Sequence, residues 1–223
     1  EDIESEKPWH SAFIVREISR TSSNFRREED LEDYLKEHDI PGICGVDTRA
    51  ITKILREHGC MGGMITTNPD FNLDEILPKL KEYTVTDAVK TVSRTEKEHF
   101  NGDGFKVALL DLGTKNNIIR SLEKRGCDVT VYPADTTAEE ILGDQPDGIK
   151  EIKKLYDSEV PIFAICLGHQ LMALATGADT EKMRWGHRGG NHPVKDLKSG
   201  RVYISSQNHG YVIKEETIDP DVA

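Results

Sequence analysis

The chain has 223 residues and a mass of 25.0 kDa, which is enough for one large domain or two small ones. Hydrophobic residues make up 36% of it, and its longest apolar runs have the length of a strand, so no membrane span of about 20 residues is expected. The net charge of −11 would be repelled by a phosphate backbone, which argues against nucleic acid as a partner.

The cysteine pattern indicates a reducing compartment. The four cysteines lie far apart and form no CxxC pair, in a chain too long to depend on disulfides for its stability. The acidic first residues also lack the basic and apolar regions of a secretory signal. We therefore predict a cytoplasmic protein without structural zinc.

The first 97 residues predict a small domain of mixed helices and strands. Apolar residues at helical spacing indicate a helix within 27–38. Asp47 is suited to cap a second helix, which Gly59 would end. A strand at 61–66 and a helix beginning at Asn72 or Asp74 complete the predicted elements of this part.

A polar, glycine-containing stretch at 98–104 is predicted to be a linker, and the pattern after it alternates between strand and helix. The apolar runs 106–110 and 128–132 flank a helical segment that Gly126 would end. Such alternation predicts a parallel sheet with crossover helices in a second domain, 105–223.

The alternation breaks near the middle of this second domain. Asp147-Gly148-Ile149 resembles the start of a strand, but the chain continues directly into an amphipathic helix at Lys150 with no turn residues between them. We therefore expect residues to be missing between 149 and 150. A strand at 160–165, a helix at 168–175, and short strands at 202–205 and 211–213 within a Gly-, His- and Asn-rich remainder are the further predicted elements.

A candidate nucleophile stands where the predicted strand 160–165 meets the next helix. Ala164 and Gly168 place small residues two before and two after Cys166, the spacing of a nucleophile elbow. At the N-terminus of a helix a thiolate is stabilised by the helix dipole, and the backbone N–H of Leu167 would face a developing oxyanion. The alternative is a buried cysteine that fills the end of a strand, and the spacing favours the catalytic role.

Several segments resemble one known family. Residues 163–170, FAICLGHQ, closely resemble the signature of the class I (triad) glutamine amidotransferases. Residues 186–194 and 206–211 are similar to the small, glutamine-hydrolysing chain of carbamoyl-phosphate synthase, and residues 23–26 and 46–52 are similar to the N-terminal domain that is particular to that chain. The resemblance extends over essentially the whole sequence.

The resemblance implies roles for individual residues. Cys166 would be the nucleophile that forms a γ-glutamyl thioester, and Leu167 would be an oxyanion donor through its main chain. His169 belongs to the motif without serving as its base. Glutamine would be bound by Gln170, Asn208, Gly210 and Tyr211.

The sequence also departs from the family pattern. The family takes its catalytic His and Glu from a His-Pro-Glu segment, which we expect beyond Ala223. Its second oxyanion donor comes from a glycine-rich loop that we expect in the gap at 149/150. The domain 1–97 corresponds to only part of the family's N-terminal domain.

By resemblance, the second domain has a flavodoxin-like open parallel sheet, preceded by a smaller α+β domain. The chain would hydrolyse L-glutamine and deliver ammonia to the large subunit of carbamoyl-phosphate synthase in a heterodimer. That subunit would use ATP, Mg²⁺ and bicarbonate to make carbamoyl phosphate for arginine and pyrimidine synthesis. No cofactor is expected in this chain.

Other interpretations stay open. The signature also occurs in the amidotransferase subunits of other pathways, such as anthranilate synthesis, although these lack the N-terminal part. A scaffold subunit that binds glutamine or a partner without hydrolysis is a second alternative, because the sequence contains no His-Pro-Glu base. His187, His192 and His209 do not have the spacing of a zinc site, and we expect them to form hydrogen bonds in loops.

Overall fold

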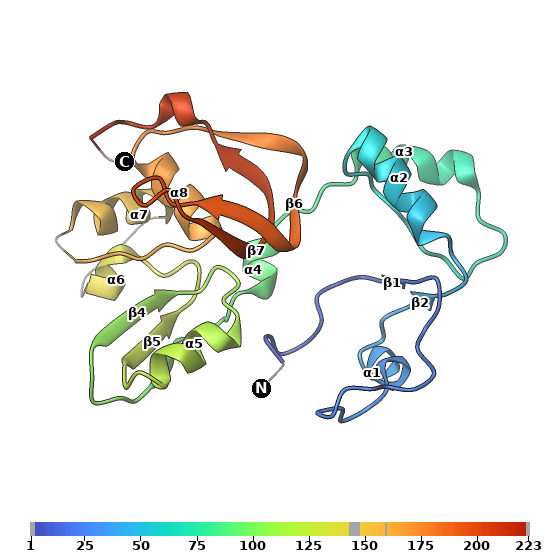
Figure 1. The fold of residues 1–223 in the computed structure, drawn as a ribbon, viewed down its shortest axis with the longest axis horizontal. Helices are drawn as coiled ribbons and strands as arrows, with labels where there is room; N and C mark the ends of the chain where they lie inside the picture. Colours follow the sequence, from blue (N-terminus) through green and yellow to red (C-terminus); the bar gives the residue numbers. More distant parts are fainter. Residues whose placement is uncertain (1–2, 143–147, 159, 222–223) are drawn as a thin grey trace. The chain divides into compact units, whose positions relative to one another are not determined.

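Residues 3–142, 148–158 and 160–221 are described by a computed structural model, which divides the chain into two units between Thr86 and Asp87 (Figure 1). This division corrects the predicted linker at 98–104. Residues 98–100 form a strand that pairs within the sheet of the second unit. Composition suggested a linker because the stretch is polar, but backbone hydrogen bonds to a neighbouring strand do not require apolar side chains.

The described residues of the first unit form short helices and one pair of very short parallel strands. Asp47 accepts a hydrogen bond at 3.0 Å from the backbone N–H of Ala50, and Gly59 ends the same helix with φ of 88°, as predicted. The elements are β1 (Phe13–Ile14), α1 (Leu31–Glu37), β2 (Gly42–Ile43), α2 (Thr48–His58) and α3 (Leu73–Glu82).

The strand predicted at 61–66 is wrong, because this segment has no strand partner in the structure. It lies instead close to α3. A Cβ atom on Gly62 would stand 2.4 Å from the carbonyl oxygen of Leu80, so only glycine permits this approach. The helix predicted to begin at Asn72 or Asp74 is confirmed, with Asn72 as its cap.

The second unit contains a three-stranded sheet in the order β3-β5-β4, of which β4 and β5 are labelled in Figure 1. Strands β4 and β5 are parallel and are joined by α5, as the alternating pattern predicts, whereas β3 is antiparallel to β5. The elements are α4 (Ala88–Val92), β3 (Glu98–Phe100), β4 (Lys106–Leu110), α5 (Asn116–Glu123), β5 (Asp128–Tyr132), α6 (Ala138–Leu142), α7 (Gly148–Asp157), α8 (Leu167–Ala175), β6 (Thr180–Lys195), β7 (Val202–Ile213) and the 3₁₀ helix η1 (Glu215–Thr217).

The core of the second unit lies where α5 packs on this sheet. Val129 and Val131 of β5 are fully buried, and Ile119 of α5 is buried against them. The central position of β5 explains this burial, because β5 has a neighbouring strand on each side and α5 on one face. The fold is therefore mixed α/β with parallel strands.

The middle of the second unit differs from the prediction. Gly148 and Ile149 lie in α7 and form no strand, while Asp147 lies outside the described residues. Ile149 and Lys150 follow one another in this helix. The segment 160–165 is not paired with another strand among the described residues, and Phe163 is 88% exposed. A strand needs a neighbour for its backbone hydrogen bonds, and the preceding segment forms α7 instead of such a neighbour.

The Gly-, His- and Asn-rich remainder forms a long antiparallel hairpin, so the short strands predicted at 202–205 and 211–213 are parts of a single strand, β7. The register shifts twice along the hairpin, between Lys182 and His187 and between Gly189 and His192. These irregularities interrupt the alternating pattern by which a strand is recognised from its sequence. In the part of the chain that the structure describes, no helix is long and apolar enough to cross a membrane.

Candidate active site

Cys166 stands at the sharp turn between the segment 160–165 and α8. Its backbone has φ of 53° and ψ of −107°, a conformation that L-residues rarely adopt. The other described non-glycine residues with positive φ, Asp39 and Asp87, belong to the type of residue that tolerates this region best. A strained backbone of this kind costs about 1–3 kcal/mol and is characteristic of a nucleophile elbow, so the predicted turn is present.

Backbone hydrogen bonds and two small residues surround this turn. The N–H of Gly168 donates to the carbonyl of Ile165 at 3.0 Å, and the N–H of Gln170 donates to the carbonyl of Cys166 at 3.1 Å. A Cβ atom on Gly168 would lie 3.7 Å from the Cβ of Ala164, which is an ordinary van der Waals contact, so these two small residues lie side by side at the turn. The turn leaves the Cys166 residue exposed.

Leu167 is the first residue of α8, where the helix itself offers no acceptor for the backbone N–H. An N–H group in this position next to a nucleophile can stabilise negative charge on an oxygen of a tetrahedral intermediate. The local geometry therefore suits both the nucleophile and the main-chain donor that the sequence analysis named.

The structure brings Gln170 of α8 to the predicted substrate segment of β7. The side-chain Nε2 of Gln170 donates to the carbonyl oxygen of Tyr211 at 2.8 Å. Asn208 and Gly210 lie on the same strand, within three residues of Tyr211. Two segments about 40 residues apart in the sequence thus meet beside the elbow.

The carbonyl oxygen of Tyr211 has a second donor, Nδ1 of His209, at 2.7 Å. A carbonyl oxygen can only accept a hydrogen bond, so this contact assigns a proton to Nδ1 of the His209 ring. Nε2 of the same ring lies 3.1 Å from Nδ1 of His187 and 3.0 Å from Oε1 of Gln207. The Tyr211 carbonyl therefore joins α8 to a histidine pair within the hairpin.

The predicted hydrogen bonding of the histidines is confirmed for His187 and His209, although they lie in strands and not in loops. Nε2 of His192 is buried and has no hydrogen-bond partner among the residues that the structure describes. His169 is exposed on α8. Among the described residues, no hydrogen bond joins Cys166 to a histidine, and no cluster of three metal-binding side chains is present.

A glycine in β6 permits the close approach of the two strands at this site. Gly186 has φ of 70°, and a Cβ atom on it would stand 2.4 Å from the carbonyl oxygen of His209. We expect Gly186→Ala to destabilise the protein by more than about 1 kcal/mol in urea unfolding, because both the conformation and the space exclude a side chain. Gly190→Ala in the same strand is the matched control: its Cβ would meet no atom within 4 Å. Equal stabilities of the two variants would contradict the hairpin register.

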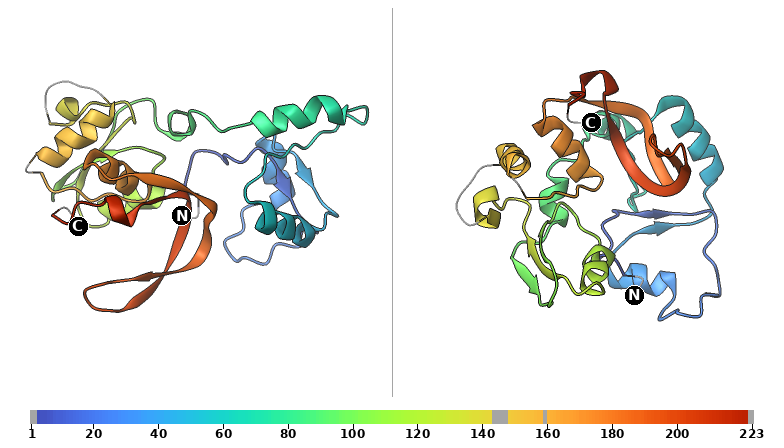
Figure 2. Two further views of the ribbon diagram at one scale, coloured as in Figure 1. Left: turned by 90° about the horizontal axis from the view of Figure 1, so that it is seen from above. Right: turned by 60° about the vertical axis from the view of Figure 1, so that its left-hand side comes forward.

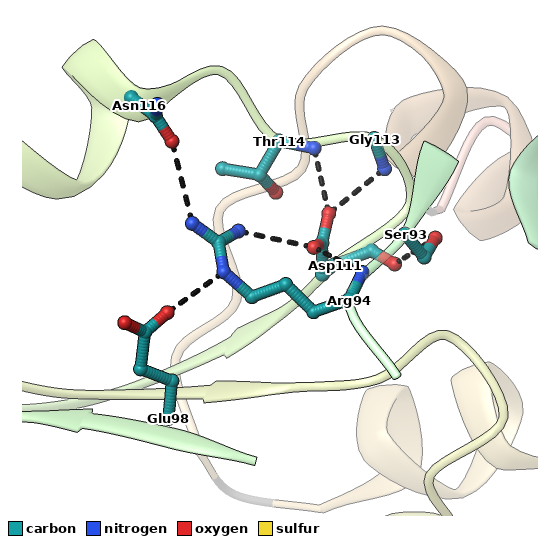
Figure 3. A network of polar contacts seen from close by, with 7 residues as sticks. All are labelled: Ser93, Arg94, Glu98, Asp111, Gly113, Thr114 and Asn116. Carbon is teal, nitrogen blue, oxygen red and sulfur yellow. Dashed lines mark hydrogen bonds and ion pairs between the residues drawn. The ribbon is translucent and has the colours of Figure 1, made fainter. Parts of the chain in front are cut away.

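Sequence reasoning missed a buried ion pair close to the end of β4 (Figure 3). Asp111 directly follows β4 and is 1% exposed. One of its carboxylate oxygens accepts from the N–H groups of Gly113 and Thr114 at 2.9 and 2.7 Å. The other accepts from the N–H and from Nη1 of Arg94 at 3.0 and 3.1 Å. The only sequence signal was an aspartate that follows an apolar strand and lies two residues before a glycine.

This network fixes the loop after β4 to the segment that precedes β3. The hydroxyl of Ser93 donates to the carbonyl of Asp111 at 2.7 Å, and the Arg94 guanidinium also contacts Glu98 at 2.8 Å. Burial by itself raises the pKa of Asp111, but the hydrogen bonds from Thr114, Arg94 and Gly113 outweigh it, so the pKa lies below its usual range. The carboxylate is thus charged and fully paired.

Comparison with known proteins identifies the family of the second unit. Residues 108–223, more than half of the chain, match the family model described as glutamine amidotransferase class-I. The chain belongs to the class-I glutamine amidotransferase family. Residues 1–65 match a second model, that of the carbamoyl-phosphate synthase small chain, CPSase domain. The elbow at Cys166 therefore lies within the amidotransferase match.

Similar curated proteins are the carbamoyl phosphate synthase small chains of Clostridium perfringens, 48% identical over 96% of this chain, and of Bacillus cereus, 47% identical over 98% of it. That of Fusobacterium nucleatum is 44% identical over 98% of this chain. The chain spans 64–65% of the length of these relatives. The aligned lengths of 229 to 235 residues exceed the 223 of this amidotransferase, so the relatives carry residues at internal positions where it has none.

Proposed function

We propose that the chain is the glutaminase subunit of a carbamoyl-phosphate synthase. The observation that carries this proposal is the strained, exposed Cys166 at a nucleophile elbow within an amidotransferase region, preceded by residues 1–65 that match the small-chain domain. The names of its relatives, which agree with this reading, support it further.

In the proposed reaction, the thiolate of Cys166 attacks the side-chain amide carbon of glutamine to give a tetrahedral intermediate. The N–H of Leu167 stabilises the negative charge on the amide oxygen. The C–N bond then breaks, and the leaving nitrogen takes up the proton that the Cys166 thiol gave up on becoming a thiolate, so that ammonia departs and a γ-glutamyl thioester remains. Water hydrolyses the thioester to glutamate and returns the free thiol.

The proposed substrate site lies between α8 and the end of β7. Gln170, Asn208, Gly210 and Tyr211 would hold glutamine, and the contact of Gln170 Nε2 with the Tyr211 carbonyl supports their assignment to one site. The finer fold that we propose is a flavodoxin-like sheet, of which β4 and β5 are the parallel strands. The ligand would then lie at the carboxyl ends of the strands, the usual place in such folds.

The partner that we propose is the large synthetase subunit, which would bind ATP and Mg²⁺ and consume the ammonia. This chain needs no cofactor of its own for amide hydrolysis by a thiol. A cytoplasmic location is supported by its four free cysteines. Carbamoyl phosphate would serve arginine and pyrimidine synthesis.

One observation favours a second candidate, a subunit that binds without hydrolysis: no described histidine is hydrogen-bonded to Cys166. An amidotransferase subunit of anthranilate synthesis is less well supported, because residues 1–65 match the carbamoyl-phosphate synthase domain. Incubation of the full-length gene product with glutamine separates the candidates. Release of glutamate supports the glutaminase, whereas binding of glutamine without release supports the second candidate.

We also expect a glutamine-like electrophile to label Cys166, with glutamine protecting it. Cys44 and Cys60 are exposed as well and serve as internal controls, because they have no substrate site and glutamine should not change their labelling rates. Mass spectrometry of tryptic peptides measures each site. Labelling of Cys166 that is indifferent to glutamine would contradict the assignment.

A further inference from the structure

The outer end of the β6–β7 hairpin carries apolar side chains that the described chain does not cover. We call residues 193–204 the hairpin tip. Leu197 is 87% exposed and Ile204 is 67% exposed, and Val194, Val202 and Tyr203 are exposed beside them. The hairpin forms a sheet of only two strands and extends away from the helices of its unit (Figure 2, left). A two-stranded ribbon is marginally stable in water, and exposed apolar patches mark interaction sites.

The hairpin also has a charge opposite to that of the chain. Between residues 180 and 213, six basic residues stand against two acidic ones, in a protein of net charge −11. At the tip, Lys195, Lys198 and Arg201 form no ion pair with the described residues. The carboxylate of Asp196 accepts instead from the hydroxyl of Ser199 and the N–H of Lys198 within the turn. The tip therefore presents unpaired positive charge next to apolar surface.

We propose that the hairpin tip docks on an acidic, partly apolar face of the synthetase chain that receives the ammonia. This inference rests on the proposed function. A protein face fits better than a phosphate polymer, because it can offer apolar side chains to Leu197 and Ile204 as well as carboxylates to the basic residues of the tip. A two-fold dimer through the tips would bring like charges together, which disfavours a second copy as the occupant.

The charged part is tested with the triple variant Lys195→Glu, Lys198→Glu, Arg201→Glu in the full-length chain, by its binding kinetics to the full-length synthetase chain. We expect the association rate constant to fall about 10-fold or more at low salt, with a smaller difference at high salt, because opposite charges steer association. The matched control is Lys90→Glu, Lys106→Glu, Lys124→Glu. This control makes the same charge change at exposed lysines outside the hairpin. Its association rate constant should stay within about 2-fold of that of the unsubstituted chain.

The apolar part is tested with Leu197→Ser, Ile204→Ser. We expect the complex to dissociate about 10-fold faster while association is nearly unchanged, because buried apolar contacts act mainly on the dissociation rate. Val85→Ser, Phe105→Ser removes exposed apolar side chains elsewhere and is the control. All variants should release glutamate from glutamine as the unsubstituted chain does, since none of these residues belongs to the candidate active site.

The outcomes separate the two proposals. If the unsubstituted chain releases glutamate and binds the synthetase chain, but the tip variants bind equally well, the docking surface is refuted and the proposed function stands. If the unsubstituted chain neither releases glutamate nor binds, both proposals fail. Self-association through the tip, or tip-dependent binding to RNA or anionic vesicles in place of the synthetase chain, would also overturn the inference.

Discussion

Replacement of Cys166 by serine should lower glutamine-dependent glutamate release by on the order of 10³-fold or more, because the nucleophile of covalent catalysis is lost. The substitution removes almost no volume from an exposed position, so the fold should remain. If the proposed synthetase subunit is the partner, its synthesis of carbamoyl phosphate from added ammonia should persist. Cys44→Ser, at another exposed cysteine, is the control and should retain activity.

The strain at Cys166 has a stability consequence that is separate from activity. With φ of 53° and ψ of −107°, the position favours glycine over any residue that has a Cβ atom. We expect Cys166→Gly to be more stable than Cys166→Ala by about 1 kcal/mol in urea unfolding, and we expect both variants to lack glutaminase activity. A less stable glycine variant would mean that the elbow is not strained.

Replacement of Asp111 by alanine should destabilise the protein by about 3 kcal/mol or more, because it removes the buried acceptor that the Arg94 guanidinium shares with three backbone N–H groups. Asp111→Asn should be nearly as damaging. Both carboxylate oxygens accept two hydrogen bonds, and an amide would turn one acceptor into a donor that faces other donors. Glu98→Gln changes the partner on the exposed side of the same guanidinium and should lower the free energy of unfolding by less than about 1 kcal/mol.

The Asp111 carboxylate also makes the free energy of unfolding depend on pH. The folded-state pKa of Asp111 lies below its ordinary value of 3.8, so its contribution is fully present above that value and is lost as the pH falls through the lower folded pKa. We expect the difference in unfolding free energy between the unsubstituted chain and Asp111→Asn to shrink as the pH is lowered from neutral to below about 4. A difference that stays constant over this range would contradict a charged Asp111.

Elements that are determined by residues within or next to them were predictable from the sequence. The helix between Asp47 and Gly59 has its cap and its terminator within its own sequence. Strands β4 and β5 are short apolar runs flanking one helix, and their parallel pairing follows from that order. The elbow at Cys166 was also visible, because its small neighbours and the change from an apolar run to a helix lie within a few residues.

Other features depend on which segments meet in space, and only the tertiary structure decided them. The segment 160–165 has the composition of a strand, but pairing needs a neighbour and α7 does not provide one. Asp111 and Arg94 lie 17 residues apart, so no local pattern could reveal their bond. The contact of Gln170 with Tyr211 spans 41 residues. Sequence therefore determined the chemical groups of the site, and long-range backbone pairing and burial decided which of them lie together.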